Sequence, residues 1–278
     1  MKTRILFIII AGLCVPLSYL MAAEEKVDHL TVPLSNPGKS GHVDVGLLKG
    51  SITITGYEGN EVDITARTRI KDVSNRERKR DGTEGMFHIP ISSSELQVEE
   101  KDNHVEIDVQ AMKNSVDLEI KVPVNTSLTV QTVHDGEITI NNVRGEIEAE
   151  SVHGGITLLD VSGSVAASTT HGDVKVTMNQ ISPDKPMSFN TFHGDVDVTL
   201  PATLKANVRI KTTQGEVYSD FKIIKTEKPD MLTTNKDRDE DGRYRVVIEH
   251  GFYGTIAGGG PEFSFSTYHG DIFIRGAK

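Results

Sequence analysis

The chain has 278 residues, a formal net charge of −10, a single cysteine, no tryptophan and only 5% aromatic residues. An acidic surface repels the phosphates of nucleic acids and anionic lipid headgroups, so nucleic acid is excluded as an expected partner. The sole cysteine, Cys14, leaves no internal disulfide and no cysteine-based metal site. The scarcity of aromatic residues predicts a core built from Ile, Val, Leu and Ala.

Residues 1–23 have the features of a secretory signal peptide. Basic Lys2 and Arg4 precede an uncharged apolar run that ends in Met21-Ala22-Ala23, and small residues are typical of a cleavage site. An uncleaved anchor is the alternative, because the uncharged run is 19 residues long and nearly spans a bilayer. The small-residue end favours cleavage. We therefore expect residues 24–278 to be exported to the periplasm, the cell surface or the medium, with no membrane span.

Glycines spaced nine residues apart, at Gly41, Gly50 and Gly59, mark the start of a regular repeat. The residues after them alternate between apolar and polar, which is the period of a strand with one buried face. A polar segment at 71–94 then interrupts the pattern as an expected surface loop. Strands are expected at 51–54, 61–64, 96–99, 105–109 and 116–123, with a hairpin turn at Asp102-Asn103.

The spacing of nine becomes strict between residues 136 and 176, where apolar residues stand two and four places after each glycine. A nine-residue unit with one short strand and one turn cannot bury its apolar face alone. Successive units are therefore expected to stack into a β-solenoid rather than form a meander of hairpins. The second apolar column alternates between large and small residues, which predicts two strands per 18-residue coil. The glycines are Gly136, Gly145, Gly154, Gly163 and Gly172, and the alternating column is Ile140, Ala149, Leu158, Ala167 and Val176.

A second motif, Ser/Thr-x-His followed closely by glycine and a strand, recurs along the chain. Glycine suits a tight corner because it reaches backbone angles that a Cβ disfavours. The motif resembles the repeats of the bacterial "putative adhesin" domains of unknown function, and the resemblance covers roughly Val27 to Arg275. It implies an envelope β-solenoid and supplies no catalytic residues. The copies end at His134, His153, His171, His193 and His269, and a variant copy ends at Gln214.

After Gly172 the repeat loosens, and the added residues include 182–186 and 201–202, which solenoids accept as bulges at corners. Strands are expected at 243–249 and 262–266, and nothing helical exceeds two turns. The predicted fold is therefore an all-β, single-domain β-solenoid of the β-helix or β-roll kind. It spans residues 24–278 and carries two polar loop insertions, at 71–94 and 222–242.

The histidines of the motif form the first candidate site. If the coils stack in register, histidines of adjacent coils lie about 5 Å apart along one edge, which is the strand spacing. Such a column could bind zinc or sense pH. Ligands on one straight edge point the same way and rarely close a tetrahedron, so a structural role in the turn is the alternative. The candidate binding residues are His153, His171, His193 and His269, with Asp173, Asp195 and Asp271 two positions further on.

The second candidate site is Asp237-x-Asp239-x-Asp241-Gly242, which has the opening of a calcium-binding loop. Position twelve of such a loop is a bidentate glutamate, and here it is Ile248. Lys236 and Arg238 also offset the negative charge. A plain polar turn is therefore the alternative to calcium binding at 237–242, and no other cofactor is expected.

We find no motif for a nucleophile with its base, for a zinc peptidase or for a phosphate loop. The outward positions of the strands are mainly Thr, Glu, Asp and Lys without aromatic residues, whereas carbohydrate-processing sites usually have aromatic platforms. We therefore expect an exported, non-catalytic cell-envelope protein that presents a rigid β-sheet face for binding or adhesion to an envelope or surface protein or glycan. The alternative is a polysaccharide lyase or glycosidase, with Asp173, Lys175, Asp195 and Asp197 lining a groove.

Overall fold

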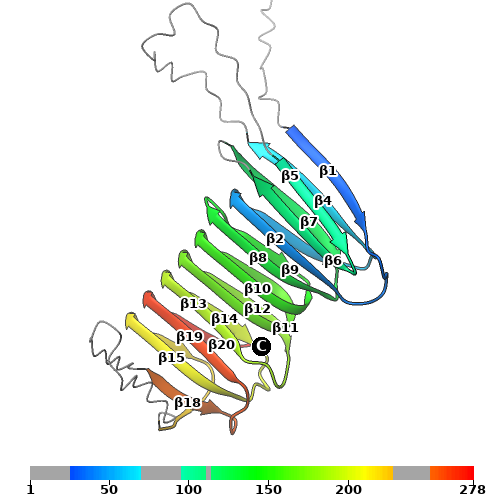
Figure 1. Ribbon diagram of the computed structural model, residues 1–278. Helices are drawn as coiled ribbons and strands as arrows, with labels where there is room; N and C mark the ends of the chain where they lie inside the picture. The colour runs from blue at the N-terminus through cyan, green and yellow to red at the C-terminus, as the bar shows by residue number, and fades with distance from the viewer. Residues whose placement is uncertain (1–25, 70–94, 111–113, 228–250) are drawn as a thin grey trace, which may run out of the picture.

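The computed structural model describes residues 26–69, 95–110, 114–227 and 251–278, and every regular element in them is a β-strand (Figure 1). The strands stack along one axis, which confirms the all-β solenoid expected from the nine-residue repeat. None of the described residues belongs to a helix long and apolar enough to cross a membrane. The strands are β1 (Lys26–Pro33), β2 (Gly41–Lys49), β3 (Ile52–Tyr57), β4 (Glu61–Arg69), β5 (Glu95–Lys101), β6 (His104–Gln110), β7 (Ser115–Pro123), β8 (Thr126–His134), β9 (Ile138–Asn141), β10 (Arg144–His153), β11 (Ile156–His171), β12 (Val174–Ile181), β13 (Met187–His193), β14 (Val196–Leu200), β15 (Ala206–Gln214), β16 (Val217–Ser219), β17 (Ile223–Lys225), β18 (Phe252–Ile256), β19 (Glu262–His269) and β20 (Ile272–Gly276).

Each coil contributes one strand to each of two faces. The first face has the order β5, β6, β2, β8, β10, the second part of β11, β13, β19, β15, β18 and β17. The second face has the order β1, β4, β7, β3, β9, the first part of β11, β12, β14, β20 and β16. Among the described strands, the coils between the two ends pair in parallel, and antiparallel pairs occur at the ends.

Two kinds of corner link the faces. The histidine corner joins the end of a first-face strand to the start of the next second-face strand, and it contains the Ser/Thr-x-His motif and its glycine. The opposite corner leads from a second-face strand to the next first-face strand. It includes residues 142–143 between β9 and β10 and residues 182–186 between β12 and β13.

The strand register confirms a coil of 18 residues with two strands. On the second face Ile156 lies opposite Val174, 18 residues later, and β10 and β11 keep the same offset on the first face. The two nine-residue units of a coil therefore occupy different faces. This explains the alternation in residue size, because Leu158 comes from the second face whereas Ala149 and Ala167 come from the first.

Ladders of aliphatic side chains fill the space between the two faces. Burial of one Val, Leu or Ile side chain contributes about 1.5–3 kcal/mol, so the ladders are the main source of stability. On the first face, the buried ring of Phe189 stacks on Phe265 with ring centroids 5.3 Å apart. One second-face ladder whose members are all fully buried consists of Ile52, Ile138, Ile156, Val174, Val196 and Ile272.

The order of the coils along the axis differs from their order in the chain. The coil of β2 and β3 stacks between β6–β7 and β8–β9, so the repeat does not begin at one end of the solenoid, as its position in the sequence suggested. The last coil, β19 and β20, stacks between β13–β14 and β15–β16. Figure 1 shows β19 lying between β13 and β15. Both terminal parts of the solenoid are therefore inserted between coils from other parts of the chain.

Several local expectations can be compared with these strands. The hairpin at residues 96–109 is confirmed, because β5 and β6 pair antiparallel and Asp102 and Asn103 have positive φ angles of 56° and 65°. The start of the expected insertion at 222–242 is not a loop, since Ile223–Lys225 form β17 and pair with β18. The signal peptide at 1–23, the insertion at 71–94 and the strand at 243–249 lie outside the described residues.

Candidate functional site at the histidine corner

The Ser/Thr residues of the motif are buried, and their hydroxyls link successive coils. Each hydroxyl donates a hydrogen bond to a glycine carbonyl in the neighbouring coil, with oxygen–oxygen distances of 2.8–3.4 Å. Such bonds satisfy carbonyl groups that a corner would otherwise leave without a partner. The pairs are Thr132 with Gly50, Ser151 with Gly136, Thr169 with Gly154, Thr191 with Gly172, Thr267 with Gly194 and Thr212 with Gly270.

The glycines allow this close approach between coils. A Cβ built on Gly154 would lie 2.0 Å from the carbonyl oxygen of Gly136, and Gly154 has a φ of +148°. Gly172 stands in the same position one coil further on, with a φ of +141°. Both the contact and the backbone angle therefore exclude a side chain here.

The histidines form one column of stacked rings, as the motif spacing predicted. Ring centroids of successive histidines are 4.8–5.5 Å apart, with interplanar angles of 2–28°. His153 Nδ1 lies 3.3 Å from the Val133 carbonyl oxygen, so a histidine of this corner can bond a neighbouring carbonyl. In axial order the column is His134, His153, His171, His193 and His269; the first four are exposed and His269 is half-buried.

Stacking affects the titration of His193. Its pKa is lowered from the ordinary value, mainly by desolvation and then by repulsion from the flanking His269 and His171. An imidazolium at this position would be poorly hydrated and would face two other rings that can also take up protons. The column therefore favours neutral imidazoles.

The expected aspartates form a second column beside the histidines. The Asp173 carboxylate accepts a hydrogen bond from the backbone N–H of Asp195, and Asp195 accepts one from Asp271. Asp271 in turn accepts one from Glu216, and all three distances are 2.8 Å. One oxygen of each aspartate is thus used to link coils, and each carboxylate keeps its negative charge on the edge.

The histidines and aspartates share an edge without enclosing an ion. In the described part of the chain, no group of three or more His, Cys, Asp or Glu side chains is arranged to hold a metal. Parallel rings one strand spacing apart account for this, because their nitrogens do not converge on one point. The expected calcium ligands Asp237, Asp239 and Asp241 lie outside the described residues, so calcium binding there stays a prediction.

A ridge of exposed apolar and hydroxyl side chains runs beside the histidine column. It consists of the residue between Ser/Thr and His in each motif, which points outward from the first face. Val152 is 37% exposed, Phe192 46% and Tyr268 39%, and the Phe192 and Tyr268 rings stack with centroids 4.8 Å apart. The expectation of an aromatic-free surface was therefore wrong. The variable position of the motif gave the signal, because its side chains are apolar in several copies.

The second face also carries an aromatic pair and binds one of the residues assigned to a groove. Tyr218 stacks on Phe273 at 5.3 Å, and the Arg275 guanidinium lies 5.1 Å from the Phe273 ring centre. Arg275 also donates hydrogen bonds to both carboxylate oxygens of Asp197, at 2.7 and 3.2 Å. Asp197 therefore stabilises the face, whereas the role expected in a catalytic groove requires a carboxylate that faces the substrate.

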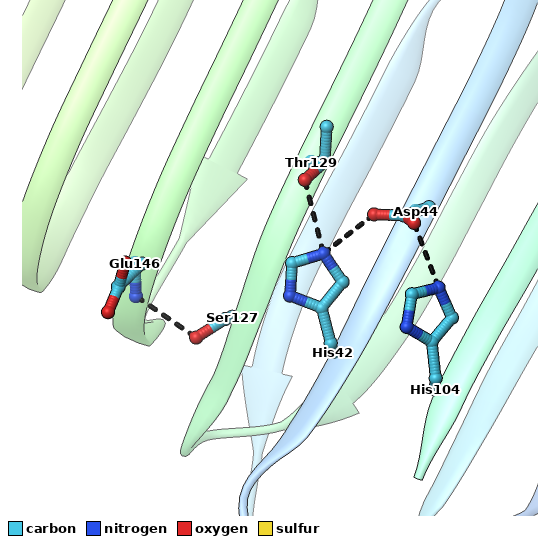
Figure 2. A network of polar contacts seen from close by, with 6 residues as sticks. All are labelled: His42, Asp44, His104, Ser127, Thr129 and Glu146. Atoms are coloured by element: carbon cyan, nitrogen blue, oxygen red, sulfur yellow. Dashed lines mark hydrogen bonds and ion pairs between the residues drawn. The ribbon is translucent and has the colours of Figure 1, made fainter. Parts of the chain in front are cut away.

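A polar network that the sequence did not indicate lies on the first face (Figure 2). His42 Nε2 is 2.7 Å from one oxygen of Asp44, and His104 Nε2 is 2.9 Å from the other. The same His42 nitrogen lies 3.1 Å from Thr129 Oγ1. A carboxylate only accepts hydrogen bonds, so the proton of His42 is on Nε2, and this nitrogen is not a base for Thr129. The arrangement is therefore not a nucleophilic triad.

The network borders a shallow groove on the first face. The groove has a volume of about 530 Å³, and its floor includes the small side chains of Ala166 and Ser188. Glu146 and Glu148 line it from β10, and Lys185, which forms an ion pair with Glu146, lines it from the opposite corner. The strand register would have been needed to bring these residues together from the sequence.

Comparisons with known proteins place the chain in a family. No curated protein is significantly similar in sequence. A crystal structure of a "putative cell adhesion protein" from Clostridium sporogenes covers 91% of this chain and 100% of its own, with 13% identity and a TM-score of 0.42. One of a "putative adhesin" from Bacteroides fragilis covers 90% and 97%, with 12% identity and a TM-score of 0.31. Both TM-scores are below 0.5, so these likenesses indicate nothing about function. The family model Toastrack DUF4097 matches residues 108–252, a narrower range than the repeat suggested but just over half of the chain, and the protein therefore belongs to the Toastrack DUF4097 family.

Proposed function

We propose that this protein is an exported, non-catalytic component of the cell envelope that uses a rigid β-sheet surface for binding or adhesion. The binding edge is the histidine corner, with His153, His171 and His193 in one column and Asp173 and Asp195 in the next. Export rests on the signal-peptide features of residues 1–23.

One observation carries this proposal: the histidine corner repeats the same exposed groups at a fixed spacing on successive coils. Ring centroids stay within 4.8–5.5 Å of each other over five histidines. Buried hydroxyls beneath the rings and aspartate carboxylates beside them hold each coil in register. A pre-organised array of this kind loses little entropy on binding, and it suits a partner that is itself extended and repetitive.

The groups on this edge fit binding better than catalysis. The aspartates already accept backbone N–H bonds, and the rings stack on each other rather than orient a nucleophile. A general acid or base needs an unpaired group within reach of the substrate and a pKa near the working pH. The histidines instead offer neutral imidazole edges near pH 7, next to negative carboxylates. Such an edge provides hydrogen-bond donors and acceptors for a protein or glycan of the envelope.

The alternative is the polysaccharide lyase or glycosidase considered from the sequence. A glycosidase needs two carboxyl groups facing the same bond. Of the four residues assigned to that groove, Asp197 is paired with Arg275, and Asp173 and Asp195 accept backbone bonds. Lys175 remains exposed on β12.

The experiment compares retention on isolated envelope fragments for mature wild type and a triple variant, His153→Asn, His171→Asn and His193→Asn. Asparagine keeps a hydrogen-bonding group and tolerates turn conformations. The matched control changes three second-face residues, Thr139→Asn, Thr157→Asn and Thr177→Asn. We expect loss of retention only in the histidine variant, with cooperative unfolding preserved in both.

Two results would overturn the proposal. Equal retention of wild type and the histidine variant would move the binding surface away from the histidine corner. Release of soluble sugar products from envelope or matrix polysaccharides by the purified wild type would establish the enzyme instead.

A further inference from the structure

Charges on the outer side of the first face are sorted along the solenoid axis. Strands β10, β11, β13, β19 and β15 lie side by side in that order, and outward residues of equal register form rows across them. Each row has an acid on β10, small or neutral residues in the middle and a base on β15. One row is Glu148, Ala166, Ser188, Ser264 and Arg209, and the next is Glu150, Ser168, Asn190, Ser266 and Lys211.

The apolar ridge forms a third row across the same strands. Phe192 on β13 and Tyr268 on β19 are 46% and 39% exposed, which is unusual for large aromatic side chains of a monomer. Contiguous exposed apolar surface often marks a site of protein association. From β10 to β15 this row is Val152, Thr170, Phe192, Tyr268 and Thr213.

These three rows complement themselves about their middle strand. Two strands lie on each side of β13, so a two-fold axis parallel to β13 brings β10 of one copy over β15 of the other, and β11 over β19. Glu150 then faces Lys211 of the second copy, whereas Asn190 and Phe192 each face their own equivalent. A two-fold axis parallel to the solenoid axis would instead place Glu150 on Glu150, which is repulsive.

We propose that a second copy of this chain packs against the first face, sheet on sheet, about a two-fold axis parallel to β13. Charge complementarity sets the direction of packing, and the apolar ridge supplies surface that loses contact with water. An interface of this type is isologous, as in most soluble dimers.

The size of the five-strand surface fits a dimer. Five strands at about 4.8 Å and about seven residues at 3.3 Å give a footprint of roughly 24 by 23 Å, or about 550 Å² per copy. The total of about 1,100 Å² is just above the roughly 1,000 Å² expected of a specific interface. The groove between Glu148 and Ser264 provides room for long side chains of the second copy.

The dimer is independent of the proposed binding function, but it has a consequence for it. The two-fold axis keeps the strand direction of both copies, so both histidine corners lie at the same side of the dimer. Two binding edges in one particle would raise the apparent affinity for a repetitive partner through multivalency.

The test is sedimentation velocity of the mature chain and of two single charge reversals, Glu150→Lys and Lys211→Glu. Each variant places like charges together and is expected to weaken the dimer roughly tenfold to a hundredfold. An equimolar mixture of the two variants should form a heterodimer, because at both contacts the side chain at position 150 of one copy then faces an opposite charge at position 211 of the other. Lys175→Glu, on the opposite face, is the control that should not change the mass.

The double variant with both reversals should dimerise like wild type. A monomeric wild type at the highest soluble concentration would overturn the proposal. A dimer that neither single reversal weakens would also overturn it, because the contact would then lie elsewhere. Circular dichroism of each variant distinguishes a dissociated chain from an unfolded one.

Discussion

The histidine corner and the opposite corner close the same coils, but the sequence controls them very differently. At the histidine corner, hydroxyl-to-carbonyl bonds, stacked rings and carboxylate-to-backbone bonds link each coil to the next. At the opposite corner the connection has two residues at 142–143 and five at 182–186, although the flanking strands stay in register. One corner therefore fixes the register of the coils, and the other absorbs differences in length.

The largest effect is expected from lengthening each corner. An insertion of Gly-Ser-Gly-Ser between His171 and Gly172 would separate a ring and a glycine that both contact the next coil. We expect loss of the cooperative unfolding transition. The same insertion between Pro183 and Asp184 should cost only about 1 kcal/mol, because lengthening a surface loop adds little closure entropy. Urea denaturation followed by circular dichroism measures both, and equal loss at the two sites would contradict the comparison.

A substitution of glycine separates contact from backbone strain. Gly154→Ala places a Cβ 2.0 Å from the Gly136 carbonyl oxygen and is expected to cost about 3 kcal/mol or more. Gly258→Ala is the matched control, since Gly258 also has a positive φ, +91°, but has nothing within 4 Å of its Cβ position. Strain alone should cost about 1 kcal/mol there. Similar unfolding free energies for both variants would show that the corner is not tightly packed.

Removal of one hydroxyl tests the buried ladder. Thr169→Val keeps the shape of the side chain and removes the donor that lies 2.9 Å from the Gly154 carbonyl oxygen. We expect a loss of about 1 kcal/mol in the free energy of unfolding. Thr170→Val, one residue further on and exposed, should change stability by less than about 0.5 kcal/mol. An unchanged Thr169→Val variant would show that water replaces this bond.

The smallest effect concerns pH. Because the pKa of folded His193 is below the ordinary value of 6.5, the unfolded chain binds more protons, and stability should fall as the pH drops through about 6.5. The fall should end below the lowered folded pKa. His193→Asn should reduce the difference between denaturation midpoints at pH 7.5 and pH 5.5, whereas His29→Asn, exposed on β1, should not. A difference that persists unchanged in His193→Asn would assign the pH effect to other groups.

Much of the local structure could be predicted from the sequence, because it depends on short periods. The alternation around Ile156 and the spacing of His153 and His171 identified the coil length and the ring column, and the strand register confirms both. The chemical reason for Thr169 in the motif was not predictable in the same way. Its partner, the Gly154 carbonyl, lies in another coil, and a sequence pattern does not show which backbone group a buried hydroxyl meets.

The stacking order of the coils was not predictable from the repeat. Every coil presents similar ladders on both sides, so the coil of β2 and β3 matches many neighbours equally well. For the same reason, the contact of Asp44 with His104 and the charge sorting from Glu150 to Lys211 appear only when the register is known. The candidate site was located correctly as an edge, but its exposed ridge was overlooked because the variable residue of the motif seemed uninformative.

The intercalation of the two terminal coils also limits the route by which the molecule reaches its native topology. The space for β19 and β20 lies between strands that precede them in synthesis, and the pairs that fill it join residues 76 and 55 positions apart. A chain emerging from its N-terminus therefore cannot complete the solenoid coil by coil, and distant pairing of this kind slows folding. Completion has to wait for the last residues of the chain. Loss of those residues would not shorten the solenoid at one end but would leave an unfilled gap within it.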